Sequence, residues 1–492
     1  MELTKDEEIT INEYLVSKGL PTNVSVTFDD VFIPEDESPV RSRAEIYDFS
    51  TNLAEDFVLK MPLVSANMES VTGVSMAVAM AREGGLWFLP QSLKIKHRLE
   101  MLDQIRRTDC AFIHNPLTVR PDATLHEAKK RMEKFGVNSL IITNKDGFVA
   151  GILTSRDWHF EADDSKTVIS LAGATNELVV APKDIIFGAA AAILKENKIE
   201  KLPLVNAGGQ LAGLITAHGL FYNLYHPRAT RDDKGRFVLC GTVGVGKTFT
   251  KSHLKEAEAQ AKKGIRILLI DTARAFSVNT KEAVIKIRKN FPELILVVGN
   301  VSSAKGARAL FEWGADVVKV NQGRGHVCRT SKIGVGQPQL TAIAECSVIA
   351  RRYGKRIMAD GGMKSSGDLV KAIIAGADAL MTGYLVVGTD ESAAPKKFNK
   401  DGFPVKTYQG SASLDAQLER IKHGTLDRIR EPEGISEEVP ITGSLNETIQ
   451  SLLDSLRSAM SYFGVRSVHE LREKGIFKMQ SRAGLIEGTK SS

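Results

Sequence analysis

Short apolar runs recur along most of the chain, and polar or charged segments separate them. Most runs are followed by a stretch with apolar residues at helical spacing, such as residues 252–263. Continuous apolar strands that alternate with helices are typical of a parallel sheet. The eight runs expected as strands are residues 61–66, 85–90, 236–240, 267–271, 294–299, 317–320, 356–360 and 379–383.

Eight such units predict an α/β fold of the (β/α)₈ TIM-barrel type. Active sites of these barrels lie at the C-terminal ends of the strands. Polar or small residues stand at or just after five of the expected ends, so we expect the site there. These residues are Asp271, Asn300, Cys328, Asp360 and Gly383.

A long gap between the second and third runs contains an internal repeat. Residues 119–125 recur loosely as 180–186, and residues 139–157 recur as 202–219. Each copy reads as an extended start, a helix and two strands, and the pair resembles a tandem of CBS modules. The expected domains are 1–108 (first part of the barrel), 109–227 (tandem CBS regulatory domain) and 228–492 (the rest of the barrel).

CBS modules commonly bind adenine or guanine nucleotides, and a threonine and an aspartate of each module hold the ribose. Thr154 and Asp157 match these two residues in the first copy. Thr216 matches in the second copy, but Gly219 stands in place of the aspartate. The resemblance therefore implies purine nucleotides as regulatory partners, and the alternative is a repeat that only packs.

Composition and charge narrow the class of protein. The chain has 492 residues, 43% hydrophobic and 25% charged, which fits a globular protein of two or three domains. A net charge of +6 is spread among interleaved acids and bases, so we expect no nucleic-acid partner. No apolar run approaches the roughly 20 residues of a membrane span. Four widely spaced cysteines and no visible targeting signal favour the cytoplasm.

The segment 321–330 is the first candidate for chemistry. It follows the apolar run 317–320, and glycines at 323 and 325 allow close approach to a ligand. Cys328 on such a loop is a candidate nucleophile. The alternative is a buried, inert cysteine.

Residues 241–248 match the phosphate-binding pattern G-x-x-x-x-G-K-T, which would indicate a P-loop NTPase. Two observations disfavour this interpretation. The match falls within one unit of a regular series of eight units, and the acidic strand ending at Asp271 follows immediately. We keep the P-loop NTPase as a remote alternative.

Several motifs together resemble the IMP dehydrogenase / GMP reductase family. They are the Cys328 loop and residues 27–33, 65–72, 298–301, 334–340 and 359–362. The resemblance implies a barrel that binds a purine nucleoside 5′-monophosphate. It also implies that a cysteine attacks C2 of the purine and that a nicotinamide cofactor exchanges hydride at this carbon.

By this resemblance Cys328 is the nucleophile, and Thr330 and Glu433 move protons at C2. Asp360 is expected to bind the ribose of the nucleotide. Other residues that the resemblance places around the nucleotide are Ser65, Met68, Gly325, His326, Gly361, Gly362, Gly383, Tyr384, Tyr408 and Gly410.

The segment Asp271, Thr272 and Ala273 resembles the one that meets the nicotinamide ribose. The backbone carbonyls of Gly323, Gly325 and Cys328 resemble a monovalent-cation site, which implies K⁺. This chain also departs from the family pattern in the cysteine loop. His326 replaces a serine that contacts phosphate, and Asn321 replaces the first glycine of the loop.

The family contains two activities, and the expected flap at residues 411–440 distinguishes them. The dehydrogenase activates water with an Arg-Tyr pair on its flap, but no arginine of this segment precedes a tyrosine. The pair Arg352-Tyr353 lies elsewhere, after the cysteine loop. The flap therefore favours the GMP reductase of the family, and the resemblance implies that this enzyme converts GMP to IMP with NADPH, as a homotetramer that can pair into an octamer. IMP dehydrogenase is the alternative, because the CBS insert and residues 483–485 resemble that enzyme.

Overall fold

The computed structural model describes residues 2–108, 112–113, 115–172, 178–233, 235–246, 249–422 and 426–489. The chain forms two compact units. The first comprises residues 1–102, 228–230 and 238–492, and the second comprises residues 103–227 and 231–237.

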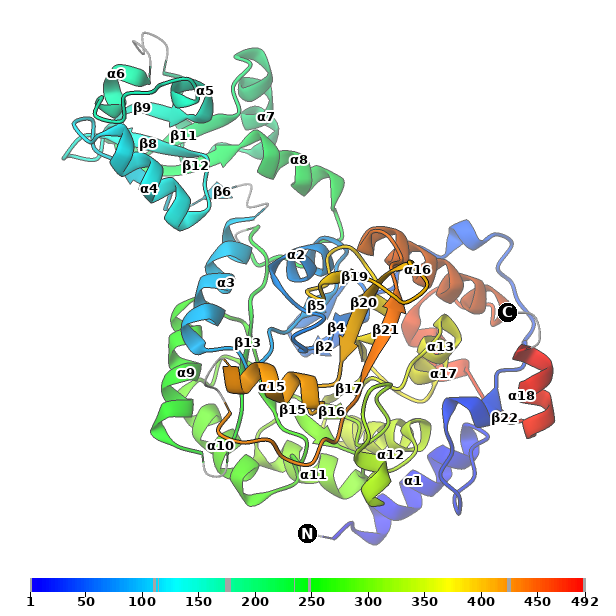
Figure 1. Cartoon of the computed structure of the whole chain (residues 1–492). Coiled ribbons are helices and arrows are strands. Elements are labelled where there is room, and N and C mark those ends of the chain that lie inside the picture. Colours follow the sequence, from blue (N-terminus) through cyan, green and yellow to red (C-terminus); the bar gives the residue numbers. More distant parts are fainter. Residues whose placement is uncertain are drawn as a thin grey trace. The chain divides into compact units, whose positions relative to one another are not determined.

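Eight parallel strands form the centre of the first unit, in the order β13-β14-β15-β16-β17-β18-β4-β5 (Figure 1). This arrangement confirms the predicted (β/α)₈ TIM barrel. The strands are almost wholly buried, as expected of a barrel with a packed interior. Their bounds are β4 Leu63–Ser65, β5 Leu86–Trp87, β13 Cys240–Val243, β14 Ile267–Asp271, β15 Ile295–Val301, β16 Val317–Val320, β17 Arg356–Asp360 and β18 Ala379–Thr382.

The strand β13 differs from the sequence prediction, which placed it at residues 236–240. Residues 237–239 are buried, but Phe237 pairs with Arg231 in an antiparallel bridge and only Cys240 joins the barrel. The apolar run therefore marks burial rather than the strand itself. Residues 241–243 of the phosphate-loop match lie inside this barrel strand, which disfavours a P-loop, and Lys247 and Thr248 lie outside the described residues.

Helices surround the barrel strands (Figure 1). Local signals set their ends: Ser303 accepts a hydrogen bond from the N–H of Gly306 at 3.2 Å where α11 begins, and Gly314, with φ of +117°, ends it. The helices of this unit are α1 Lys5–Ser17, α2 Val74–Arg82, α9 Lys251–Lys262, α10 Val278–Asn290, α11 Ala304–Trp313, α12 Gln339–Arg352, α13 Ser366–Ile374, α14 Tyr384–Val387, α15 Leu414–Lys422, α16 Leu445–Tyr462, α17 Val468–Lys474 and α18 Arg482–Thr489.

Near the N-terminal ends of the strands, Asp316 is held by several donors. Its carboxylate accepts from Lys355 Nζ at 2.7 Å, from the Leu296 N–H at 2.9 Å and from Arg288. Burial by itself would raise the pKa of Asp316, but these hydrogen bonds and the charge of Arg288 lower it below its ordinary value. This cluster ties α10, β15 and the residue before β17 to the residue before β16.

After the last barrel strand, β18, the chain forms a three-stranded sheet that includes part of the expected flap. Strand β20 (Pro404–Gln409) pairs antiparallel with β19 (Lys396–Phe398) and with β21 (Ser436–Pro440). Helix α15 lies between β20 and β21 in the chain. The expected flap therefore consists of a helix, a connecting segment and a strand anchored in a sheet.

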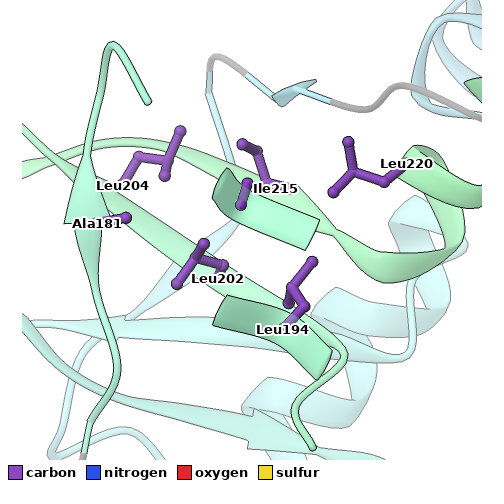
Figure 2. Packing of buried hydrophobic residues seen from close by; sticks show 7 residues of the cluster. Ala181, Leu194, Leu202, Leu204, Ile215 and Leu220 are labelled. Atoms are coloured by element: carbon purple, nitrogen blue, oxygen red, sulfur yellow. The ribbon is translucent and has the colours of Figure 1, made fainter. Parts of the chain in front are cut away.

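The second unit contains the repeat twice in the predicted order of strand, helix and two strands. The sheets are β7-β8-β9 and β10-β11-β12-β6. Figure 2 shows the core of the second copy, in which Leu194, Leu202, Leu204 and Ile215 are buried together. The elements are β6 Phe112–Ile113, β7 Thr118–Val119, α4 Leu125–Phe135, β8 Ser139–Thr143, β9 Val149–Thr154, α5 Ser155–Trp158, α6 Val168–Leu171, β10 Ala181–Pro182, α7 Phe187–Glu196, β11 Lys201–Val205, β12 Leu211–Thr216 and α8 Ala217–Tyr225. Helix α3 (Ile95–Arg107) lies at the boundary of the two units.

The remaining elements are short. They are η1 Phe28–Asp30, β1 Val31–Phe32, η2 Arg43–Glu45, β2 Thr51–Ala54, β3 Phe57–Leu59, η3 Thr330–Ile333 and β22 Lys478–Met479. Within the part of the chain that the structure describes, we find no helix with the length and apolar character needed to cross a membrane.

Candidate active site

The residues expected at strand ends meet at one end of the barrel. Asp271 and Asp360 are the last residues of β14 and β17, and Asn300 is the penultimate residue of β15. The Cys328 loop follows β16, and Gly383 follows β18. Because all these strands are parallel and in register, their C-terminal ends bring the polar residues to a common face.

The Cys328 loop has a defined shape. Gly323 has φ of +77°, and a Cβ there would lie 2.7 Å from the backbone nitrogen of Ser331, so this turn requires glycine. The N–H of Cys328 donates to the carbonyl of Gly325 at 3.0 Å. Asn321 accepts from the N–H of Arg324 at 3.1 Å and donates to the carbonyl of Asp360. The asparagine that replaces the family glycine thus links the loop to β17.

A short stretch of the flap pairs with this loop. The N–H of Arg329 donates to the carbonyl of Glu433 at 2.7 Å, and the N–H of Ile435 donates to the carbonyl of Val327 at 3.0 Å. Cys328 and Gly434 are partners in the antiparallel bridge between these bonds. The pairing fixes the flap segment against the cysteine loop.

Cys328, Thr330 and Glu433 form a chain of hydrogen bonds. The Cys328 Sγ donates to Thr330 Oγ1 at 3.4 Å, and Thr330 Oγ1 donates to Glu433 Oε2 at 2.8 Å. The threonine hydroxyl therefore connects the thiol with a carboxylate. A proton can pass along this chain to or from a group bound at the sulfur.

Tyr408 is buried beside the expected nucleotide site. Its hydroxyl donates to Met68 Sδ at 3.6 Å, and a Cβ at Gly383 would meet its ring. Burial, and then the nearby charge of Asp360, raise the pKa of Tyr408, so the phenol stays protonated as a donor. Ser65 is also buried and accepts from Thr72 Oγ1 at 2.9 Å.

His326 lies among aromatic rings. Its ring centroid is 4.0 Å from that of Tyr384 and 6.4 Å from that of Tyr408. Its Nε2 lies 2.8 Å from Glu437 Oε2, but without the geometry of a hydrogen bond, so the contact becomes an ion pair only when the imidazole is protonated. Sequence reasoning missed Glu437, because only the pairing of β20 and β21 places it opposite Tyr408.

The glycines of the expected phosphate site differ in their backbone conformation and in the partners of their amides. Gly361 and Gly362 have φ of +71° and +79°, which the tight turn after β17 requires. The N–H of Gly361 donates to the carbonyl of Met381 at 2.8 Å, so this amide serves the sheet. Gly410 is close to the loop, since a Cβ there would lie 2.7 Å from the carbonyl of Val327.

Lys319, which sequence reasoning missed, connects two of the expected ligand-binding carboxylates. Its Nζ lies 2.6 Å from Asp360 Oδ2 and 3.2 Å from Asp271 Oδ1, and its side chain is 4% exposed. Asn300 Nδ2 donates to Asp360 Oδ2 at 2.8 Å, and Asn67 Nδ2 donates to Asp271 Oδ2 at 2.9 Å. The available signal was a single lysine in an otherwise apolar strand.

The expected cofactor segment, residues 271–273, begins with the carboxylate of Asp271. Thr272 uses its backbone to bind β15, because its N–H donates to the carbonyl of Gly299 at 2.8 Å. The carbonyl of Ala273 accepts from Gln322 Nε2 at 3.2 Å. Asp271, with a side chain 21% exposed, is the member whose acceptor oxygens suit ribose hydroxyls.

At the expected cation site, the carbonyl of Gly325 already accepts from the N–H of Cys328. The binding of K⁺ by Gly323, Gly325 and Cys328 stays a prediction. Hard oxygen ligands would be supplied by the backbone of this loop.

The expected regulatory residues lie in the second unit. Asp157 Oδ2 accepts from the N–H and the hydroxyl of Thr154, at 2.6 and 2.7 Å, and so caps α5. In the second copy Thr216 Oγ1 accepts from the N–H of Gly219 at 3.0 Å. Both threonines lie at the end of a strand and the start of a helix, and their nucleotide-binding role stays a prediction.

The flap and its surroundings offer two further contacts. Arg420 on α15 lies 3.2 Å from Glu69 after β4, which holds the helix against the barrel. Arg352 and Tyr353 lie at the end of α12, where the Tyr353 hydroxyl donates to Glu312 at 3.0 Å. That pair is therefore part of the outer helical layer.

Comparisons with known proteins agree with this geometry. Over residues 25–490 the chain matches the family described as IMP dehydrogenase / GMP reductase domain. An inosine-5′-monophosphate dehydrogenase of Aquifex aeolicus is 37% identical over 468 residues, 94% of this chain and 94% of that protein. The enzyme of the same name from Staphylococcus saprophyticus is 38% identical over 475 residues, 94% of this chain and 95% of its own.

Solved structures carry the other name of the family. A cysteine-to-alanine variant of GMP reductase from Trypanosoma brucei, in complex with guanosine 5′-monophosphate, has a TM-score of 0.87 at 32% identity. The match covers 97% of this chain and 99% of that chain. GMP reductase from the same organism in complex with guanosine 5′-triphosphate has a TM-score of 0.77 at 30% identity, covering 95% and 99%.

These relatives carry two names, and both name oxidoreductases that use a nicotinamide cofactor. The match of the family extends through the barrel, the cysteine loop and the flap. The chain therefore belongs to the IMP dehydrogenase / GMP reductase family.

Proposed function

We propose that this protein is a GMP reductase that converts GMP, NADPH and two protons to IMP, NADP⁺ and ammonium. The observation that carries the proposal is the hydrogen-bonded chain from Cys328 through Thr330 to Glu433, on a flap without tyrosine. These hydrogen bonds supply protons to a departing amine, and reductive deamination requires such a proton donor.

In the proposed reaction the sulfur of Cys328 adds to C2 of GMP, and the amino group leaves as ammonia. Thr330 passes the required proton between Glu433 and the reacting group. A nicotinamide cofactor, when bound, supplies the hydride that C2 then gains. The carbon–sulfur bond breaks, IMP departs and Cys328 is free for the next cycle.

In this proposal the nucleotide and the cofactor are held by residues at the same end of the barrel as Cys328. Asp360 accepts hydrogen bonds from the ribose hydroxyls, and the protonated Tyr408 donates to the phosphate, as the raised pKa permits. His326 is placed beside Tyr384 and Tyr408 and replaces the family serine as a phosphate donor. Asp271 accepts from the nicotinamide ribose.

IMP dehydrogenase is the second candidate, because the curated relatives at 37–38% identity carry that name. Its reaction ends in hydrolysis of a covalent intermediate, which needs an activated water. Residues 411–440 contain no tyrosine, so the Arg-Tyr pair that does this in the dehydrogenase is missing from the flap sequence. Without that pair hydrolysis would be slow, and we therefore favour the reductase.

The test follows the absorbance of reduced nicotinamide in two mixtures, GMP with NADPH and IMP with NAD⁺. Loss of absorbance only in the first supports the reductase, and a gain only in the second establishes the dehydrogenase. If neither mixture reacts, the proposal fails, and ATP hydrolysis is then measured to test the P-loop alternative at residues 241–248.

We further propose that the repeat unit binds purine nucleotides and regulates the barrel in a homotetramer that can pair into an octamer. Thr154 and Asp157 in the first copy support this assignment. The related GMP reductase in complex with guanosine 5′-triphosphate makes purine triphosphates the first ligands to try. Activity and particle mass are measured with and without GTP or ATP, and no response to either contradicts the regulatory role.

A further inference from the structure

The lysine of strand β16 is unusual for its surroundings. Its three neighbours in the strand, Val317, Val318 and Val320, are fully buried and apolar, and Lys319 itself is 3% exposed. Removing an ammonium group from water is costly unless the charge is paired. Such a residue at the catalytic end of a barrel therefore calls for a reason beyond packing.

The side chain of Lys319 forms ion pairs with two carboxylates rather than one. Asp360 lies on the next strand of the barrel, and Asp271 lies two strands away on the other side. Burial by itself would lower the pKa of Lys319, but the attraction of Asp360 and Asp271 outweighs burial and raises it above the ordinary value. The lysine is therefore a permanent cation shared between these two acids.

The two acids keep acceptor capacity for a ligand. Asp360 Oδ2 accepts from both Lys319 and Asn300, and among the described residues no hydrogen bond reaches its Oδ1. Asp271 is contacted at both oxygens, by Asn67 at Oδ2 and by Lys319 at Oδ1, and each of these oxygens has a second lone pair for a ligand. Each carboxylate is thus contacted by an amide and by the common ammonium group, with side chains 19% and 21% exposed for Asp360 and Asp271.

We propose that Lys319 is a positioning residue that couples the two ribose sites, so that binding of the purine nucleotide and of the nicotinamide cofactor strengthen each other. This inference rests on the proposed function, in which Asp360 binds the nucleotide ribose and Asp271 the nicotinamide ribose. The first ligand to bind immobilises its carboxylate and with it the shared ammonium group. The second ligand then meets a carboxylate that is already fixed, and it loses less conformational freedom on binding.

The coupling is measured as a ratio of two dissociation constants. Calorimetry gives the Kd of GMP for the protein alone and at saturating ADP-ribose 2′-phosphate. This probe retains the ribose of the cofactor but lacks the nicotinamide ring, so stacking of the ring on the purine contributes nothing. For the wild-type protein we expect the Kd to fall about fivefold or more, the lower range of ordinary allosteric coupling.

In Lys319→Gln the ratio is expected to fall to about one, the value for independent sites. Lys319→Arg keeps the shared charge and is expected to restore most of the coupling. Lys371→Gln is the matched control, because this partly buried lysine donates to the backbone carbonyl of Phe28 at 2.9 Å and not to a carboxylate. Circular dichroism and thermal melting establish that each variant is folded.

A wild-type ratio in folded Lys319→Gln would overturn the proposal, and so would a ratio of one in the wild-type protein. Should Lys319→Gln not fold, Asp271→Asn tests the link from the other side at saturating probe. The ratio is again expected to fall, and an unchanged ratio counts against the coupling. Because GMP and IMP carry the same ribose, the experiment is repeated with IMP, and the ratio stays measurable even if the reductase assay is negative.

Discussion

Strand β16 has a charged cluster near each end, and the two clusters are built differently. Before its first residue, Asp316 accepts three hydrogen bonds, and both carboxylate oxygens are used by Lys355, Arg288 and the N–H of Leu296. Near its last residue, Lys319 serves two carboxylates, and one oxygen of Asp360 is left without a bond among the described residues. The same residue types thus make a closed cluster and an open one.

The difference teaches how this barrel separates stability from chemistry. In a closed cluster every carboxylate oxygen is bonded within the protein, so all of these bonds stabilise the fold. In an open cluster a carboxylate oxygen is left to accept a hydrogen bond from a ligand. This division agrees with the general rule that the N-terminal face of a TIM barrel stabilises and the C-terminal face carries the active site. Substitutions at the two faces should therefore move different quantities.

The largest effect is expected from Cys328→Ala at the C-terminal face. Loss of the nucleophile should lower kcat by about a thousandfold or more in either direction of hydride transfer. The melting temperature should stay near that of the wild type, because among the described residues the thiol makes a single hydrogen bond, to Thr330. Cys346→Ala is the control, since this cysteine is fully buried in α12, and it should affect stability rather than chemistry. Retained activity in Cys328→Ala would contradict covalent catalysis.

Glu433→Gln should have the next largest effect. The amide keeps the size of the side chain but no longer accepts a proton, so kcat should fall by about a hundredfold. The backbone pairing of residue 433 with Arg329 is unaffected by this change. Glu431→Gln, two residues away on the same segment, is the matched control. Equal losses of kcat in the two variants would show that activity depends on the total charge of the flap and not on the contact between Glu433 and Thr330.

At the opposite face, Asp316→Asn should lower the free energy of unfolding by about 2 kcal/mol, because the hydrogen bonds from Lys355 and Arg288 lose their ionic partner. The specific activity of the folded enzyme should be unchanged. Glu258→Gln, which alters an exposed pair with Lys262 on α9, should leave the denaturation curve where it is. A large loss of kcat in folded Asp316→Asn would break the division between the two faces.

The pH dependence of this destabilisation is the smallest and most specific effect. The pKa of Asp316 is lowered in the folded protein, so its stabilisation is fully present above the unfolded value of about 3.9. It is lost as the pH falls through the lower folded value. The difference in unfolding free energy between wild type and Asp316→Asn should therefore shrink in acid, as urea denaturation at neutral pH and below about pH 4 can measure. A difference that grows in acid would mean that Asp316 is not the titrating group.

Local patterns were sufficient for a large part of the candidate site. The apolar runs predicted most barrel strands. Asp271 and Asp360 end two of these runs and Cys328 lies on the loop after a third, so a local feature, the strand end, was enough to single them out. The family resemblance supplied Glu433, which lies 103 residues from Thr330, and the structure brings the two within 2.8 Å. The start of β13 was misplaced because burial and membership of the barrel sheet are not the same property: residues 237–239 are buried, but β13 begins at Cys240.

The sequence by itself therefore determined the barrel, the repeat inserted in it, the family and the cysteine proposed as the nucleophile. Only the tertiary structure decided that Lys319 reaches two acids, that Asn321 ties its loop to β17 and that Glu437 lies beside His326. The physical reason is that hydrophobic periodicity can be recognised within a short segment of neighbouring residues. A contact across the barrel depends instead on strand order and register, which fix side chains from distant segments at one place.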